Sequence, residues 1–197
     1  MNAPKKIETT FSSRRREPEL MAEVQRIFHD WLRLGVLDDV LIDVADYRHV
    51  AGGPGFLLIG HECNYRVRLT ETGVLEARCS QKRAFANGRC PVAETFTRGV
   101  KVCRMLEEHS GRTRLFDCSR VRVAARDRLS TRRPGFSIEE FAWHVRQSLS
   151  RELFTVPQVK VRSDREFPLA EVKWVAERTM QGLDERAYHP GTTGAVG

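Results

Sequence analysis

Apolar residues recur every three or four positions in three segments of the chain, a spacing that predicts three amphipathic helices. The first helix ends at Gly35, a residue that suits the left-handed end of a helix. The second begins at Pro91, because proline is favoured at the first helical position. The third begins at Ser137, which forms a capping box with Glu140.

Runs rich in β-branched and aromatic residues, bounded by turn residues, predict strands between these helices. The run FLLIGHECNYRVRLT is expected to be one long strand, joined through the tight turn ETG to VLEARCSQKR as a hairpin. The segment PLAEVKWVAERTMQG fits either period, and we expect residues 168–181 to form a helix. The expected strands are residues 40–50, 56–70, 74–83, 113–129 and 155–163.

This order of elements predicts an α+β domain with a mainly antiparallel sheet and helices packed on one face. Residues 1–16 are polar and end in three arginines, so we expect them to form a flexible basic arm. Residues 17–183 are expected to form a single domain, because no long linker interrupts them. Residues 184–197 are expected to form a loose C-terminal tail.

Alternation along residues 56–69 divides this expected strand into an apolar and a polar set. The apolar set is expected to face the helices, which turns His61 and Cys63 toward the core and Glu62 away from it. His61 and Glu62 are therefore not expected to work as a catalytic pair. The apolar set is Leu57, Ile59, His61, Cys63, Tyr65, Val67 and Leu69, and the polar set is Phe56, Leu58, Gly60, Glu62, Asn64, Arg66 and Arg68.

Arginine dominates the positive charge of the chain. The formal net charge is +7, and 27 of the 33 basic residues are arginine. Arginine is a fork-shaped donor suited to phosphate and carboxylate groups, although a GC-rich genome enriches arginine through codon usage alone. The 26 acidic residues are interspersed with the arginines, which favours the second explanation.

Several of these arginines are expected to share the sheet face that the helices leave open. Such a face suits a protein partner, RNA or single-stranded DNA. The alternative is a solvated face on which Glu62 or Glu76 pairs with a neighbouring arginine across the strands. The candidate anion-binding residues are Arg66, Arg68, Arg78, Arg120 and Arg122.

Chemically capable side chains also gather around the turn AGGPG. This turn leads into a strand, so it matches neither the P-loop nor the dinucleotide fingerprint, which both lead into a helix. Active sites nevertheless tend to lie on loops at strand ends. The candidate site residues here are Asp43, Asp46, Tyr47, Arg48, His49 and His61.

The five cysteines include no CxxC pair, so neither a zinc ribbon nor a disulfide framework is predicted. No cofactor and no metal is expected. The weak metal candidates are His61, Cys63 and Cys79, whose alternative role is packing in the core. Cys90 is a candidate reactive thiol because it precedes a helix beside Arg89, and its alternative role is to cap that helix.

No apolar run approaches the roughly 20 residues that a membrane-spanning helix needs, and no secretory signal is recognised. A cytoplasmic protein is therefore expected. The segment LIDVADYRHVAGGPGFLLIGHECNY, with the preceding RIFHDWLRLGVLDD, resembles a group of uncharacterised bacterial proteins. The resemblance covers about a third of the chain. It implies a bacterial, cytosolic α+β protein and identifies no site residues, because that group has no established reaction.

Two functions remain open from the sequence. The first is a non-enzymatic binding module for a protein or nucleic-acid partner, suggested by the arginine-bearing sheet face and by the lack of a complete catalytic set. The second is an enzyme or a metal or redox sensor with a site around the AGGPG turn and His61 and Cys63. The sequence does not distinguish a monomer from an oligomer.

Overall fold

The computed structural model describes residues 6–86, 88–127, 131, 136–163, 167–174 and 180–182. Its strands form one eight-stranded sheet in the order β2-β3-β4-β5-β1-β6-β8-β7, and every neighbouring pair is antiparallel. The strands are β1 Ile7–Arg16, β2 Leu41–Tyr47, β3 Gly55–Gly60, β4 Cys63–Leu69, β5 Val74–Gln81, β6 Arg120–Ala125, β7 Gln158–Ser163 and β8 Pro168–Lys173; the helices are α1 Leu20–Leu34, α2 Pro91–Ser110 and α4 Ile138–Leu153. The predicted α+β class with an antiparallel sheet is confirmed.

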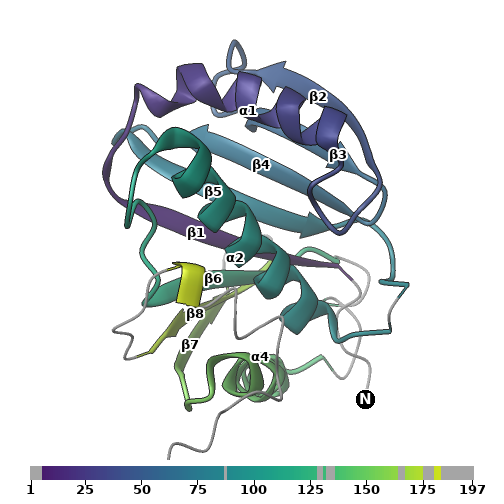
Figure 1. Cartoon of the computed structure of the whole chain (residues 1–197). Coiled ribbons are helices and arrows are strands. Elements are labelled where there is room, and N and C mark those ends of the chain that lie inside the picture. Colours follow the sequence, from purple (N-terminus) through teal and green to yellow (C-terminus); the bar gives the residue numbers. More distant parts are fainter. Residues whose placement is uncertain are drawn as a thin grey trace, which may run out of the picture.

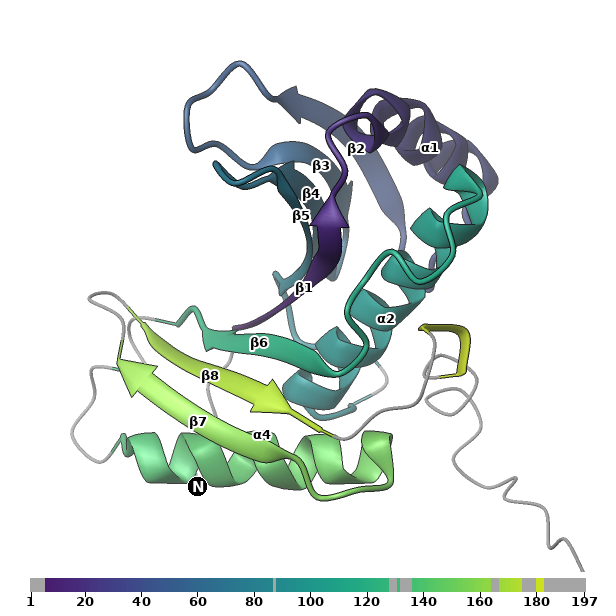
Figure 2. The same ribbon diagram turned by 90° about the vertical axis from the view of Figure 1, so that its left-hand side faces the viewer.

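The sheet bends into an open curve, and the described helices pack on its outer side. Figure 2 shows α1 and α2 outside the curve and α4 beneath β7 and β8. In Figure 1, α2 runs across the middle of the sheet. Its Gly99 makes this close packing feasible, because a Cβ there would lie 2.7 Å from the ring of Phe11 on β1. The inner, concave side of the curve carries no described helix.

The N-terminal segment is a central strand, so the expected flexible arm is wrong for residues 7–16. β1 pairs with β5 on one side and β6 on the other. Its residues alternate: Ile7, Thr9 and Phe11 are buried against the helices, while the side chains between them face the concave side. This period of two is a strand signal, and the polar composition of the segment obscured it. Residues 1–5 and the expected tail at 184–197 lie outside the described residues.

Residues 56–69 form a hairpin and not the single long strand that the alternation predicted. β3 ends at Gly60, His61 and Glu62 form the turn, and β4 begins at Cys63. The turn reverses the facing of the residues before it, so Phe56 and Leu58 are buried on the same side as Cys63. The assignment of residues 57–61 to the helix face is therefore wrong, whereas the assignment from Cys63 onward is confirmed.

The segment expected to be a helix at 168–181 begins as strand β8. Pro168–Lys173 lies between β6 and β7 and pairs with both. Ala170 and Val172 are fully buried, a period of two that pairing on both sides stabilises. Residues 175–179 lie outside the described residues, and residues 180–182 are helical. None of the helices in the described part is long and apolar enough to cross a membrane.

Replacing Phe11 tests the central position of β1. Phe11→Ala should lower the free energy of unfolding by about 3–5 kcal/mol, because the ring is fully buried and packs against Phe96. Ser12→Ala, on the opposite side of the same strand, should change it by less than about 1 kcal/mol. Urea unfolding followed by circular dichroism measures both variants. Equal stability of the two would show that this segment does not belong to the core.

Candidate functional site

Arginine and glutamate side chains from four neighbouring strands share the concave face. Register places Arg66 opposite Arg78, Arg78 opposite Thr10, and Thr10 opposite Arg122, so these side chains form one row across the sheet. We call the connected charged residues on this face the arginine–glutamate network: Glu8, Arg66, Arg68, Glu76, Arg78, Arg122 and Arg126. Arg120 lies beyond Arg122 on β6 and pairs with Asp117 at 2.7 Å.

Glu8 is the first of two carboxylates that hold the network together. Its side chain is 8% exposed and accepts hydrogen bonds from Arg126 at 2.8 Å, Arg78 at 3.2 Å and Arg66 at 3.4 Å. Ser80 Oγ donates a further bond of 2.8 Å. One buried carboxylate on β1 thus gathers arginines from β4, β5 and the end of β6.

Glu76 is the second carboxylate, and it lies directly opposite Ser12 of β1. Its side chain is 5% exposed and accepts hydrogen bonds from Arg68 at 2.9 Å and Arg78 at 2.8 Å. Arg122 of β6 also pairs with it. Arg78 therefore bridges the two carboxylates, and its own side chain is only 12% exposed.

The arginines dominate the electrostatics of this face. Burial acts to raise the pKa of Glu76, but the hydrogen bond from Arg78 and the charge of Arg122 outweigh burial and lower that pKa to about 2. Burial likewise opposes ionisation of Glu8, yet the charges of Arg78 and Arg126 bring its pKa below the ordinary value. Both carboxylates are therefore ionised at neutral pH. Five arginines against two glutamates leave an excess of three positive charges.

Arg66 and Arg78 are like charges placed directly opposite each other on β4 and β5, an arrangement that is unfavourable unless negative charge compensates it. The Nε atom of each is buried and has no hydrogen-bond partner among the described residues. Burial lowers the pKa of Arg66, and the neighbouring charge of Arg78 lowers it further. The surroundings of Arg66 therefore contain more positive than negative charge.

Two hollows lie at one end of this face, on either side of the turn between β4 and β5. The rim hollow has a volume of about 630 Å³ and is bounded by Tyr47, Arg48 and Arg68. The central hollow has a volume of about 400 Å³ and is bounded by residues that include Glu76, Arg120, Arg122, Glu171 and Lys173. Thr70 and Thr72 line both hollows, so the turn forms their shared wall.

The structure does not gather the residues expected around the AGGPG turn into one site. Asp43, Asp46, Tyr47, Arg48 and His49 are all exposed on β2 and the loop after it. Arg48 donates a 2.8 Å hydrogen bond to Asp46 and covers the Phe56 ring at 4.4 Å, and Tyr47 stacks on His49. His61 directly follows Gly60, which ends β3 about 17 Å along the strand from Gly55. The turn therefore borders the rim hollow without His61.

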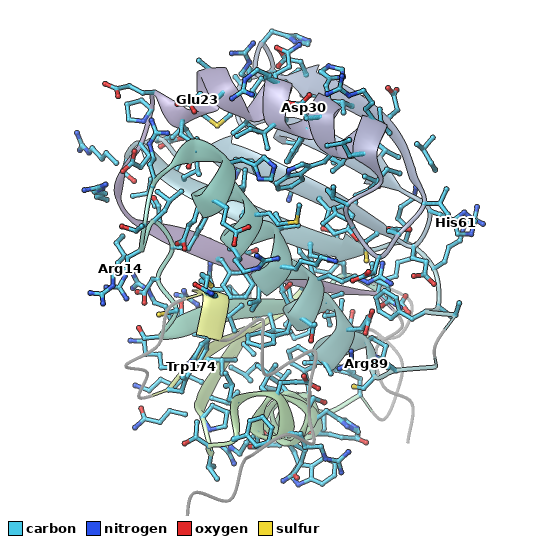
Figure 3. The ribbon with its side chains drawn as sticks, in the orientation of Figure 1. Arg14, Glu23, Asp30, His61, Arg89 and Trp174 are labelled. Atoms are coloured by element: carbon cyan, nitrogen blue, oxygen red, sulfur yellow. The ribbon has the colours of Figure 1, made fainter. Side chains whose placement is uncertain are left out.

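His61 is exposed at the outer edge of the molecule, so its expected position in the core is wrong (Figure 3). The cause is the turn, which Asp39 holds in place. The fully buried Asp39 carboxylate accepts hydrogen bonds from the backbone N–H groups of His61, Glu62 and Cys63 at 3.1, 3.0 and 2.9 Å. A Cβ at Gly60 would overlap this carboxylate, which explains the glycine at the end of β3.

Glu62 was expected to point away from the helices, and this expectation is wrong. Its carboxylate accepts a 2.5 Å hydrogen bond from Arg98 of α2, whose guanidinium also donates to Glu94 at 2.9 Å. The same guanidinium lies 3.5 Å from Asp39. Arg98 thereby ties α2 to the β3–β4 turn. The residues of the sequence GHEC therefore form a turn that contacts α2, which gives this segment a structural role.

The weak metal candidates do not converge. Cys63 and Cys79 are fully buried, whereas His61 is exposed. Burial raises the pKa of the Cys79 thiol, and its contact with the Cys63 thiol raises it further, so the Cys79 thiol is protonated and unreactive at neutral pH. No group of three or more metal-ligating side chains occurs among the residues that the structure describes.

Cys90 is exposed at the start of α2, as the sequence predicted, and its Sγ lies 3.2 Å from Ser148 Oγ of α4. Cys90 occupies the N-cap position of α2, as its alternative role required, but its side chain makes no capping hydrogen bond to the helix. Arg89, which is labelled in Figure 3, pairs with Glu94 at 3.1 Å and with Glu152 at 3.2 Å. Arg89 therefore faces two carboxylates, and the Cys90 thiol contacts the Ser148 hydroxyl, which is not a base at neutral pH.

Sequence reasoning found the arginines of the concave face but missed several of their partners. Arg66, Arg68, Arg78, Arg120 and Arg122 share the face as predicted, and Glu76 pairs across the strands as the alternative proposed. Glu8 was missed because it lay in the expected arm, although the alternation of Ile7, Thr9 and Phe11 around it was visible. Arg126 and Asp39 carried no local signal, since their side-chain hydrogen bonds span 22 to 118 residues. Arg98 has a nearby partner in Glu94, but its contacts with Tyr65 and Glu62 span 33 and 36 residues.

Asp39→Asn tests the structural role of the buried carboxylate. The variant should lose about 3–5 kcal/mol of unfolding free energy, because an amide cannot accept every hydrogen bond that the carboxylate accepts and leaves Arg98 less compensated. Asp38→Asn, whose side chain is 55% exposed and pairs with Lys101, should lose less than about 1 kcal/mol. Chemical unfolding compares the two. A loss as small for Asp39→Asn would contradict this role.

The lowered pKa of Glu76 predicts a specific pH dependence of stability. Ionised Glu76 stabilises the fold above its unfolded-state pKa of about 4.5, and this contribution is lost as the pH falls toward about 2. Glu76→Gln should cost about 3 kcal/mol at pH 7 and should flatten the loss of stability below pH 4.5. Glu71→Gln, on the exposed turn, is the control. Urea unfolding at several pH values measures both variants. If Glu76→Gln lost stability below pH 4.5 as steeply as the wild type, the lowered pKa of Glu76 would be contradicted.

Comparison with known proteins identifies no relative from which a role for the concave face could be transferred. No family model matches the chain, and no curated protein and no solved structure matches it significantly. The chemistry of the concave face therefore has to be inferred from its own geometry and charges.

Proposed function

We propose that the protein is a binding module that holds an anionic partner on its concave face. The observation that carries this proposal is the imbalance between donors and acceptors in the arginine–glutamate network. Five guanidinium groups carry about 25 N–H donors, whereas two carboxylates offer about eight lone-pair sites. The two carboxylates orient the arginines without using all of their donors. The unpartnered Nε atoms of Arg66 and Arg78 are buried, and the donors that remain exposed, as on Arg122 and Arg126, are available to an anion.

The shape of the sheet supports the same function. The network lies on the inner side of a curve, where converging side chains strengthen the local potential. Arg122 and Arg126 are 36% and 39% exposed, so they are accessible to a partner while still held by Glu76 and Glu8. Arginines that are already oriented lose less conformational entropy on binding than free ones.

A purely structural network is the alternative explanation, and it makes a different prediction about substitution. In the double variant Arg122→Gln/Arg126→Gln, Glu76 keeps Arg68 and Arg78, and Glu8 keeps Arg66 and Arg78. The fold should therefore persist, which a thermal unfolding scan checks. A structural network predicts an effect on stability alone, whereas a binding face predicts a loss of affinity in the folded variant.

Retention on a heparin matrix tests the proposal. The wild-type protein should be retained at low salt, and Arg122→Gln/Arg126→Gln should elute at clearly lower salt, because both lost charges lie on the binding face. The control Arg26→Gln/Arg33→Gln has the same net charge and alters exposed arginines of α1, on the outer side. It should elute close to the wild type. Equal elution of the two double variants, or no retention of the wild type, would overturn the proposal.

A further inference from the structure

The two hollows and the network together form a continuous path across the sheet. Thr70 and Thr72 line both hollows, and Arg68 belongs to the rim hollow and to the network. From the rim hollow beside Tyr47 of β2, the path crosses β3, β4, β5, β1 and β6 and reaches Lys173 of β8. These six intervals of about 4.8 Å give a length of roughly 29 Å.

Basic side chains occur along the whole of this path. Arg48 stands at the β2 end, the network occupies the middle, and Lys173 stands at the β8 end. The acidic side chains of the two hollows are Glu71 on the turn, Glu76 within the network and Glu171, which pairs with Arg162. Hydroxyl groups of Thr70, Thr72, Thr10 and Ser12 add uncharged donors suited to phosphate oxygens.

The network and the central hollow lack the exposed apolar anchors on which protein partners depend, whereas Tyr47 and Val50 line the rim hollow. Protein interfaces draw most of their affinity from a few buried aromatic or aliphatic side chains. The exposed large apolar side chains of the described residues all lie outside the network and the central hollow: Leu34, Val40, Ile42, Tyr47, Val50, Ile138, Trp143, Phe154 and Val156. A polyphosphate backbone needs no such anchor, because its affinity comes from counterion release.

We infer that the anionic partner is a single strand of nucleic acid whose phosphates follow this path from β2 to β8. The inference rests on the proposed function, since it assigns a chemical class to the partner of the same face. A flexible strand can enter hollows of about 630 and 400 Å³ one nucleotide at a time, whereas the rigid body of a duplex cannot. At the helical spacing of about 3.4 Å per nucleotide, the path holds at most about nine nucleotides.

Recognition on this path is expected to be independent of base sequence. Single-strand binding folds that stack bases present exposed aromatic rings on neighbouring strands. Here the network contains no aromatic side chain, and Phe167 beside it is covered by the guanidinium of Arg126 at 4.9 Å. Phosphate contacts therefore dominate, and such contacts position a strand without specifying its bases.

Fluorescence anisotropy with labelled oligonucleotides tests this inference. Affinity for oligo(dT) and oligo(U) should rise with length and level off at no more than about nine nucleotides. With five arginine–phosphate contacts, the affinity of the wild type should fall about 100-fold when the salt is raised from roughly 50 to 200 mM. Over the same salt range the affinity of Arg122→Gln/Arg126→Gln, which keeps three contacts, should fall only about 20-fold. A DNA duplex of the same length and an oligoglutamate peptide of the same charge should bind at least about 10-fold more weakly. Comparing oligo(dT) with oligo(U) distinguishes DNA from RNA.

A single substitution on the shared wall tests the path itself. Thr72 is exposed, and its hydroxyl is hydrogen-bonded to that of Thr70. Thr72→Glu therefore adds a negative charge between the hollows without breaking an ion pair. It should weaken oligonucleotide binding about 10-fold, whereas Gln147→Glu, with the same charge change on the exposed side of α4, should not. Equal binding by these two variants would overturn the path.

The outcomes separate this inference from the proposed function. If oligoglutamate or duplex DNA binds as tightly as the single strand while heparin retention still depends on Arg122 and Arg126, the single-strand assignment fails and the binding face stands. If no probe binds in a salt-dependent manner and heparin does not retain the protein, both fail. Binding of single strands that is unaffected by Thr72→Glu and by Arg122→Gln/Arg126→Gln would place the nucleic-acid site elsewhere on the protein.

Discussion

The pairing of β1 with β5 on one side and β6 on the other is the constraint on which the rest of the structure depends. Without this strand, β2–β5 and β6–β8–β7 would be two separate sheets with unpaired edges. The alternation of β1 serves both faces at once. Ile7, Thr9 and Phe11 contribute to the core beneath the helices, while Glu8 organises the arginines on the concave side. The core and the candidate site therefore share one backbone segment. A shift in the register of β1 would displace the side chains of both.

The curvature of the sheet separates its apolar outer side from its charged inner side. The helices cover the apolar side of the sheet and leave the inner side mainly to charged and hydroxyl residues, which Leu57 and Ile59 of β3 accompany. Two glutamates among five arginines are enough to offset repulsion between the strands and to keep the guanidinium groups oriented. The remaining positive charge is the basis of the proposal that this face holds an anionic partner.

The most chemically suggestive stretch of the chain has a structural role instead. Residues 60–63 combine glycine, histidine, glutamate and cysteine, a combination typical of active sites. Asp39 holds their backbone in a turn, and Arg98 connects that turn to α2. Cys63 then packs in the core and His61 faces solvent. Reactive residue types close together in sequence are thus placed on opposite sides of a tight turn.

The sequence by itself determined the elements whose signals are local. Left-handed glycines end α1 and α2 where the apolar period stops, Ser137 accepts the hydrogen bond from Glu140 at the start of α4, and the β4–β5 hairpin follows its turn residues. Alternation also placed Arg66 and Arg68 on the open face. Only the tertiary structure decided the rest. β1 and β8 are strands because partners on both sides pair with them, and the turn at His61 exists because a carboxylate 22 residues earlier binds its backbone. Such long-range hydrogen bonds outweigh local preferences that differ by only about 1 kcal/mol, so no window of sequence contains the information.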